Sequence, residues 1–422
     1  MKTAVVVFCI LFLQILLFAQ NNKQDIGFKV DSLSQEVLRL SEELRQIKQE
    51  KSDKEIEELR KAAKEEVQVG EKKEALTQKT FQEGARSLQE LNPEISISTD
   101  MLANYQTESP HYSAESRSGF KLRVVEFMFQ SNLDPFSSAK IIVEAGHEGV
   151  GVGEAYVTWI NLLNRLNLTA GKFRQQFGVI NRWHGHALDQ TFFPLPITLY
   201  MGEEGLNQVG LSFNWLMPRL FASANELTLQ ITNSENDKLF GGEDYSLPSG
   251  LVHFKNFYGI NPSTYLEVGL TGLAGTNDDI GFTFARSHTW TYMGGADLTL
   301  VWEPVDRARY RGLTWRSEFY YLYRDLGSSP DIEAIGGYSY LDYRLSRQFI
   351  IGARVDIAQP PELNNDEMYL WQVVPYITFW QSEFVYMRLQ WNHLEGKNID
   401  ERDNQIFVQI DWSLGPHKHE KY

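Results

Sequence analysis

From Ile95 almost to the C-terminus, apolar and polar residues alternate with a period of two. This period places one face of an extended strand in an apolar environment and the other face in a polar one. In residues 313–321, 349–357 and 385–391 the polar positions carry arginine, aspartate or glutamate. No stretch after the N-terminus reaches the roughly eighteen apolar residues of a membrane helix. The pattern predicts an all-β protein, but it fits a half-exposed sheet in water as well as a membrane barrel.

The lengths of the connections between the expected strands favour the barrel. We count roughly sixteen strands, an even number, whose connections alternate between tight and long as in bacterial barrels. The tight connections are expected at 132–135, 164–166, 218–220, 261–264, 345–347 and 381–383. The long ones are expected at 107–118, 145–153, 177–207, 233–249, 275–289, 325–331, 359–367 and 394–403. Two features depart from the pattern: Pro375 lies inside an expected strand, and the connection 303–311 is long where a tight turn is expected.

The N-terminus has the pattern of a secretory signal peptide. One cation, Lys2, precedes an apolar run from Ala4 to Phe18, and Ala19 precedes a polar segment. About fifteen apolar residues are too few to span a bilayer, so a signal peptide is favoured over a signal anchor. We expect cleavage after Ala19, which would remove Cys9, the only cysteine. Loss of Lys2 would change the formal charge from −15 to −16, which argues against a nucleic-acid partner.

Residues 20–91 are expected to form a helical periplasmic segment. They are rich in Glu, Lys, Gln and Leu, and apolar residues recur at alternating spacings of three and four. These positions form the a/d seam of a coiled coil: Val30, Leu33, Val37, Leu40, Leu44 and Ile47. The alternative is a single amphipathic helix without a partner. The all-β transmembrane barrel, of roughly 16 antiparallel strands, would occupy 92–414. A short periplasmic tail, 415–422, would follow it.

Three segments resemble a known family. Leu166–Gly178 ends in Gly-x-Phe-x-x-x-Phe-Gly, Glu154–Trp159 precedes it, and Asn181–Leu188 contains His-x-His. The first two resemble strands of phosphate-selective-type porins of the bacterial outer membrane, and the third resembles a porin-like subgroup with a His-x-His loop element. The resemblance implies a homo-oligomer, with a trimer favoured, whose third outer loop folds into the lumen. Some proteins similar to the subgroup carry labels as metal-linked outer-membrane receptors.

The connection 177–207 is the expected constriction. It is the longest connection, at about thirty residues, and it is too apolar to extend into water. Packing of its apolar side chains on the inner wall would leave six polar residues facing the opening: Arg182, His184, His186, Asp189, Glu203 and Glu204. A phosphate-selective porin would display a denser run of basic residues, so the mixture of charges leaves ion selectivity open.

His184 and His186 could bind a divalent metal with Asp189 or Glu203 as a third ligand, but a hydrogen-bonded loop is the favoured interpretation. The predicted lumen face also carries charged residues of three expected strands: Arg316 and Glu318, Arg354 and Asp356, and Arg388. These residues either line a channel or pair with one another. The sequence shows no catalytic motif and implies no cofactor. A passive channel for small solutes or ions is therefore the leading hypothesis. The alternative is an outer-membrane anchor or binding protein tethered to a periplasmic partner through the coiled segment.

Overall fold

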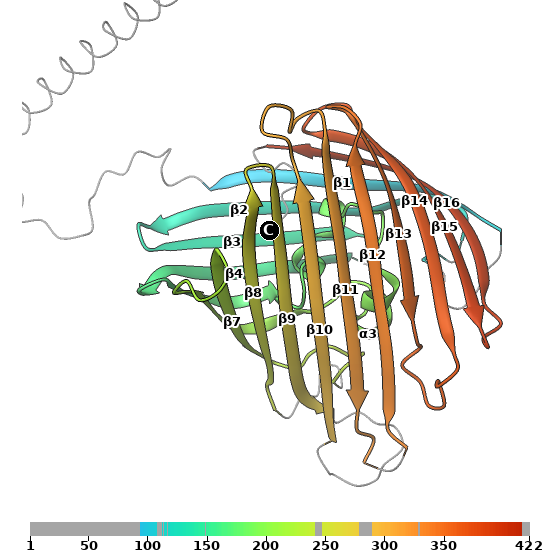
Figure 1. Cartoon of the computed structure of the whole chain (residues 1–422), viewed down its shortest axis with the longest axis horizontal. Coiled ribbons are helices and arrows are strands. Elements are labelled where there is room, and N and C mark those ends of the chain that lie inside the picture. The colour runs from blue at the N-terminus through green and yellow to red at the C-terminus, as the bar shows by residue number, and fades with distance from the viewer. Residues whose placement is uncertain are drawn as a thin grey trace, which may run out of the picture. The chain divides into compact units, whose positions relative to one another are not determined.

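Sixteen antiparallel strands form one closed barrel in the part of the chain that the structure describes (Figure 1). The computed structural model describes residues 93–415, except 108–111, 113, 116, 148, 241–246, 278–288 and 328–329. Each strand pairs with its neighbours in sequence, and β1 pairs with β16 to close the sheet. The prediction of a barrel of roughly sixteen antiparallel strands is confirmed. The expected signal peptide (1–19), coiled segment (20–91) and most of the expected tail (416–422) lie outside the described residues.

The strands have the following bounds: β1 Glu94–Gln106, β2 Gly119–Asp134, β3 Ser137–Gly146, β4 Gly149–Leu163, β5 Leu166–Arg174, β6 Asn207–Met217, β7 Ala224–Thr232, β8 Ser249–Asn261, β9 Thr264–Asn277, β10 Thr289–Trp302, β11 Gly312–Arg324, β12 Ile332–Arg344, β13 Phe349–Ala358, β14 Tyr369–Trp380, β15 Val385–Lys397 and β16 Arg402–Leu414. Two 3-10 helices, η1 Ile180–Arg182 and η2 Gly185–Ala187, and one α-helix, α3 Leu195–Met201, lie between β5 and β6. None of the described helices is long and apolar enough to cross a membrane.

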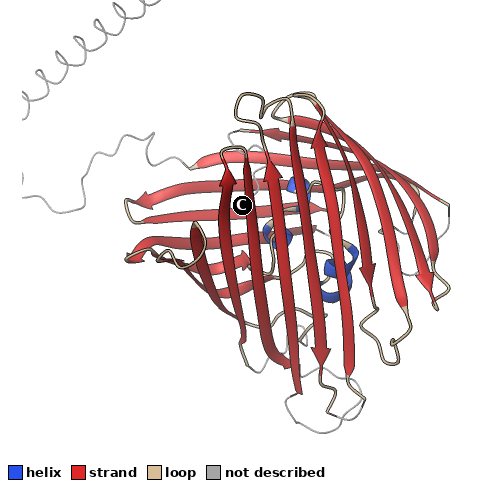
Figure 2. Ribbon diagram, in the orientation of Figure 1, coloured by secondary structure: helices blue, strands red, loops and turns tan. Residues whose placement is uncertain are grey.

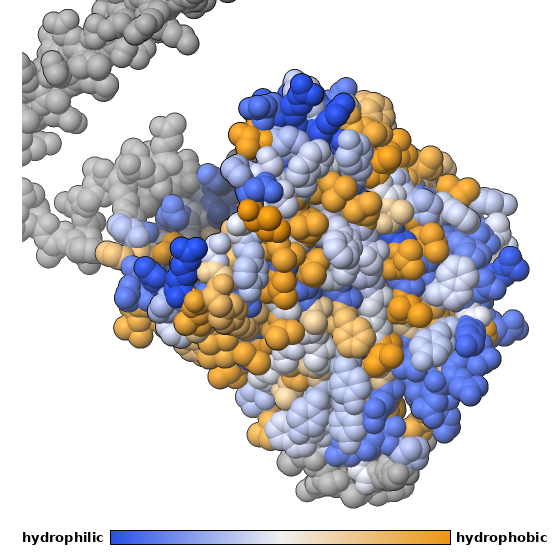
Figure 3. Space-filling model, in the orientation of Figure 1, coloured by the Kyte–Doolittle hydropathy of each residue, from blue (hydrophilic) through white to orange (hydrophobic). Residues whose placement is uncertain are grey.

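The apolar faces of the strands point outward. On β13, Val355 is 52% exposed whereas the adjacent Arg354 is 1% exposed. The same arrangement occurs on β15, where the apolar Leu389 is exposed and the charged Arg388 is buried. Figure 3 shows hydrophobic surface spread across the visible face of the barrel. A half-exposed sheet in water would bury its apolar face, so this arrangement is that of a barrel surrounded by lipid.

Two of the predicted long connections are shorter in the structure. Residues 145–153 form the turn end of a hairpin, in which β3 ends at Gly146 and β4 begins at Gly149. The glycine-rich sequence suggested a loop, but Val150 and Val152 alternate outward while Gly151 and Gly153 occupy the inward positions. The connection between β15 and β16, predicted as 394–403, is also shorter and spans only 398–401.

Pro375 lies within β14 without shifting its register. It faces Ala353 of β13, and no pairing with β15 is formed at positions 374 and 375. The pairs Val373 with His393 and Tyr376 with Gln390, on either side of the gap, keep the same register. The missing N–H of proline therefore interrupts one ladder locally, without a bulge.

The barrel encloses the connection between β5 and β6, and Figure 2 shows its three helices inside the ring of strands. Phe177, Ile180, Trp183, Ile197 and Tyr200 of this connection are almost fully buried. They pack with inward-facing side chains of several strands into the main apolar cluster of the described residues. The principal core of this protein therefore lies inside the barrel and includes the connection itself.

Candidate functional site

Residues 175–206, here called the inserted segment, leave β5 and return to the adjacent β6. Asn181 ties the two ends together: its amide nitrogen donates to the carbonyls of Gln175 at 2.8 Å and Leu206 at 3.1 Å. Its amide oxygen accepts from the Leu206 N–H at 2.7 Å. These three bonds satisfy backbone groups that would otherwise be unpaired where the ladder ends.

Glu318 of β11 anchors the start of the inserted segment. Its Oε1 accepts hydrogen bonds from the backbone N–H groups of Val179 at 3.0 Å and Ile180 at 3.1 Å. The hydroxyls of Tyr320 and Tyr338 donate to the same carboxylate at 2.7 and 2.6 Å. Four donors thus surround a carboxylate that is only 4% exposed, and these hydrogen bonds offset the free-energy cost of burying its charge. Glu318, expected on the lumen face, points inward and holds the segment.

Arg354 and Asp356 of β13 anchor the middle of the inserted segment. Arg354 donates to the Phe192 carbonyl at 2.9 Å, and Asp356 accepts from the Leu195 N–H at 3.1 Å. Arg388 of β15 donates in the same way to the Leu188 carbonyl at 2.9 Å. All three side chains are buried. The sequence placed them on the inner face, and the structure shows that the inserted segment covers them.

Asp189 contacts Arg316 of β11 and Tyr340 of β12. Its Oδ2 lies 3.5 Å from the guanidinium of Arg316 and accepts from the Tyr340 hydroxyl at 2.7 Å. The Arg316 guanidinium also stacks over the Trp183 ring, 4.5 Å from its centroid. Glu203, the other candidate third ligand, is exposed beyond the end of α3. Neither residue therefore completes a metal site at the His-x-His element.

His184 and His186 instead contact carboxylates from the barrel wall. The Nε2 of His184 lies 3.1 Å from Glu154 of β4, and its Nδ1 lies 3.5 Å from Glu126 of β2. The Nδ1 of His186 lies 3.2 Å from the other oxygen of Glu126. Both rings are buried. The prediction that they face the opening is therefore wrong. Glu126 and Glu154 were missed because their approach to the histidines depends on barrel closure and insertion of the segment.

The two histidines have opposite pKa shifts. Burial lowers the pKa of His184, and the carboxylates of Glu126 and Glu154 offset this effect only in part. Burial alone would also lower the pKa of His186, but attraction to Glu126, a hydrogen bond to it and the nearby Asp411 and Asp100 raise the pKa instead. His186 is therefore the ring that more readily carries a positive charge.

A polar cavity of about 310 Å³ lies beside the inserted segment, against the inner faces of β4 to β7. Arg174, Arg182, Glu154 and Glu226 bring both signs of charge to its lining, and threonine, asparagine and glutamine side chains provide most of the rest. Arg182 also donates to the Gln176 amide oxygen at 2.8 Å, which fixes it at the cavity edge. Such a lining can hydrate small polar solutes and ions.

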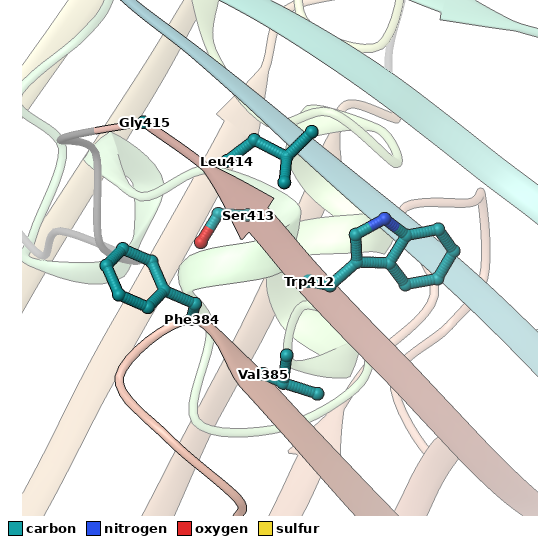
Figure 4. A pocket seen from close by; sticks show the side chains of 6 residues that line it. All are labelled: Phe384, Val385, Trp412, Ser413, Leu414 and Gly415. Carbon is teal, nitrogen blue, oxygen red and sulfur yellow. The ribbon is translucent and has the colours of Figure 1, made fainter.

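A second hollow lies on the outside of the barrel and is apolar. Phe384, Val385, Trp412 and Leu414 line it where β15 begins and β16 ends (Figure 4). Val385 and Trp412 lie at the same alternating positions as the exposed Leu389 and Val408, so this hollow belongs to the outward face. Its lining offers few polar groups, Ser413 among them, in contrast to the inner cavity.

Comparison with known proteins shows the fold and leaves the family open. No protein-family model matches the chain. An uncharacterised protein of Aquifex aeolicus is 25% identical over 345 residues, covering 73% of this chain and 71% of that protein. Among solved structures, the outer-membrane channel DcaP of Acinetobacter baumannii matches with a TM-score of 0.54 at 12% identity, covering 76% of this chain and 97% of that one. An anion-selective porin of Comamonas acidovorans matches with a TM-score of 0.54 at 10% identity, covering 76% and 99%. The described barrel therefore has a porin-like fold.

Proposed function

We propose that this protein is an outer-membrane channel for passive diffusion of small solutes or ions, narrowed by the inserted segment. One observation carries the proposal: a closed barrel with an apolar exterior retains a polar inner cavity of about 310 Å³ beside that segment. A barrel of roughly sixteen strands is too wide for its own side chains to fill. In this proposal the inserted segment occupies much of this space, and the polar cavity along β4 to β7 forms part of the passage.

Mixed charge in the passage supports weak rather than strict ion selectivity. Arg174 and Arg182 face the cavity together with Glu154 and Glu226. Glu203 and Glu204 are exposed at the end of α3 and add negative charge to the segment. Charges near a narrow passage act strongly on ions because screening by bulk salt is incomplete there. The proposed substrates are therefore small hydrated solutes, without a phosphate-specific site.

Two further features support a location in the bacterial outer membrane. The exposed apolar faces of the strands match a lipid environment, and the N-terminal sequence has the pattern of an export signal. A homo-oligomer, with a trimer favoured, is part of the same proposal and follows from the resemblance of the strand sequences to porins.

Conductance across a planar bilayer tests the proposed function. The purified full chain should produce ohmic current steps, and reversal potentials in a salt gradient should reveal a modest ion preference. Folding is checked independently by the altered migration of unheated barrel on a gel. Folded protein that inserts into the bilayer without conducting would contradict the channel.

The second candidate is a barrel that serves as an anchor. One observation favours it: the inner faces of β11, β13 and β15 are covered by the inserted segment, with Arg354, Arg388 and Glu318 buried beneath it. In that case the segment would act as a plug, and residues 20–91 would hold a periplasmic partner. A silent bilayer together with specific retention of that partner would support this alternative.

A further inference from the structure

Three neighbouring strands direct carboxylates toward one histidine of the inserted segment. Glu126 of β2 pairs directly with Glu144 of β3, and Glu154 of β4 lies opposite Ile142 of β3. One ligand atom from each of Glu126, Glu144 and His184 lies within 4.8 Å of the other two. Like charges placed directly opposite each other on a sheet are destabilising, so a cation bound between them would stabilise this pair.

Two cationic side chains make direct contacts beside this cluster. The Lys140 ammonium lies 3.6 Å from Glu154, so it balances that carboxylate most directly. The Arg174 guanidinium donates to the Glu204 carbonyl at 2.6 Å and is directed toward the inserted segment. One ligand atom of Glu126 and one of Glu144 lie within 4.8 Å of a ring nitrogen of His184, so a cation bound there would contact both carboxylates.

The His184 ring is oriented as a metal ligand usually is. Its Nε2 is 3.1 Å from Glu154, and metal-ligating histidines usually have one ring nitrogen beside a carboxylate in this way. The other nitrogen, Nδ1, is 3.5 Å from Glu126. Ligand atoms around a four-coordinate ion with bonds of about 2.1 Å lie about 3.4 Å apart, so this separation fits one edge of such a site.

Two further contacts set the positions of the carboxylates. His186 Nδ1 lies 3.2 Å from the second oxygen of Glu126 and so orients that carboxylate. Gly153, at the irregular pairing between β3 and β4, makes room for Glu144. A Cβ atom at Gly153 would lie 2.3 Å from the Glu144 carboxylate oxygen. The glycine therefore permits the conformation that brings Glu144 into the cluster.

We propose that Glu126, Glu144 and His184 bind one divalent first-row transition-metal ion, and that this ion clamps the inserted segment to β2 and β3. Imidazole and carboxylate together suit Zn²⁺, and a water molecule can supply a fourth ligand. The clamp would add β2 and β3 to the strands that anchor the segment, which already include β11, β13 and β15. This inference is independent of conduction, because a plugged barrel could hold the same ion.

Zinc binding by the full chain tests the proposal. The probe is Zn²⁺ alone, added to folded protein purified without metal affinity, with the content measured by mass spectrometry after gel filtration. A His417→Ala/His419→Ala background removes the tail histidines as competing ligands. In that background we expect one Zn²⁺ per chain and a higher unfolding temperature with zinc than with chelator. Absence of stoichiometric zinc in that background would overturn the proposal.

Substitutions then locate the ion. Glu126→Gln and His184→Gln should each weaken zinc binding by more than about 100-fold, because removal of an outer partner alone costs about 10–100-fold. The loss of zinc affinity in Glu154→Gln should lie within that smaller range of about 10–100-fold. Gly153→Ala should weaken zinc binding because its added Cβ displaces Glu144. His393→Gln is the matched control, since His393 lies on β15 between Trp371 and Trp391 and should leave the affinity unchanged. Unchanged affinity in His184→Gln would contradict the site.

A spectroscopic measurement on the unsubstituted cluster tests the proposal even where the substituted variants do not fold. Co²⁺ bound to the unsubstituted cluster, in the tail background, should give visible absorption bands of a four-coordinate site with nitrogen and oxygen ligands. One equivalent of Zn²⁺ should abolish these bands. If no such bands form, the cluster is a set of ion pairs with protonated histidine, and the metal clamp is excluded.

Discussion

The Nε of Arg354 lies 2.9 Å from Oδ1 of Asp356, two residues away on the same inner face of β13. Each member of this pair also binds the backbone of the inserted segment, Arg354 at Phe192 and Asp356 at Leu195. The ion pair therefore joins the barrel wall to the segment. Because both side chains are buried, removal of one leaves the other charge without compensation in a region of low dielectric constant.

Replacing Arg354 with Met should destabilise the barrel interior by about 3–5 kcal/mol, the usual cost of breaking a buried ion pair from one side. Urea unfolding followed by tryptophan fluorescence measures this free energy. Arg347→Met is the control, because Arg347 is exposed in the turn between β12 and β13. An equal change in the free energy of unfolding of both variants would show that the Arg354 contacts do not hold the segment.

Gly178→Ala should lower the thermal stability, whereas Gly185→Ala should not. Gly178 has φ +60°, and an added Cβ would meet the Glu318 carboxylate at 2.0 Å. The left-handed backbone alone costs a residue with a side chain about 1–2 kcal/mol, and displacement of Glu318 adds to this. Gly185 lies in the same segment with open space around it. Thermal melts of both variants in detergent give the comparison, and equal melting temperatures would contradict the anchoring role of Glu318.

Replacing Glu203 and Glu204 with Gln should shift the ion preference of the channel toward anions. Both carboxylates are exposed at the end of α3. At 0.1 M salt the Debye length is about 10 Å, and over this distance the carboxylates attract cations to the passage. We expect the cation-to-anion permeability ratio to fall about two-fold at that salt concentration. Reversal potentials measure the ratio.

The control for this selectivity change is Glu362→Gln/Glu367→Gln, which removes the same charge from the exposed connection between β13 and β14. This control should leave the permeability ratio unchanged. Equal shifts in the two double variants would place the narrowest part of the passage away from the inserted segment.

Deletion of residues 22–91 should leave a barrel that still inserts into lipid but should change the number of protomers per particle. The a/d pattern and the alternating strands are separate folding zones, so loss of the first should not unfold the second. Native mass spectrometry in detergent counts the protomers. An unchanged count would show that the barrel, rather than the coiled segment, sets the oligomeric state.

The alternation of apolar and polar residues predicted the strands, and the lengths of their connections favoured a barrel over a half-exposed sheet. The period of two fixes which side chains share a face, so Arg354 and Arg388 were placed inward and Val355 and Leu389 outward from the sequence. The glycine-rich stretch before Glu154 was misread because glycine marks loops as readily as it marks an inward face that must leave room for a neighbouring side chain. In this hairpin the room at Gly153 is taken by Glu144, a residue of the adjacent strand.

The function of the inward charges was decided only by tertiary structure. Glu318 binds Val179 across 139 positions of sequence, and Arg354 binds Phe192 across 162. Glu126 and Glu144 meet His184 only after the ladder from β2 to β4 has set their register and the inserted segment has entered the barrel. The sequence determines the direction of each side chain because the strand period is local. The partner that it meets depends on closure of the sheet and on the path of the segment, because these bring together residues that no local period relates.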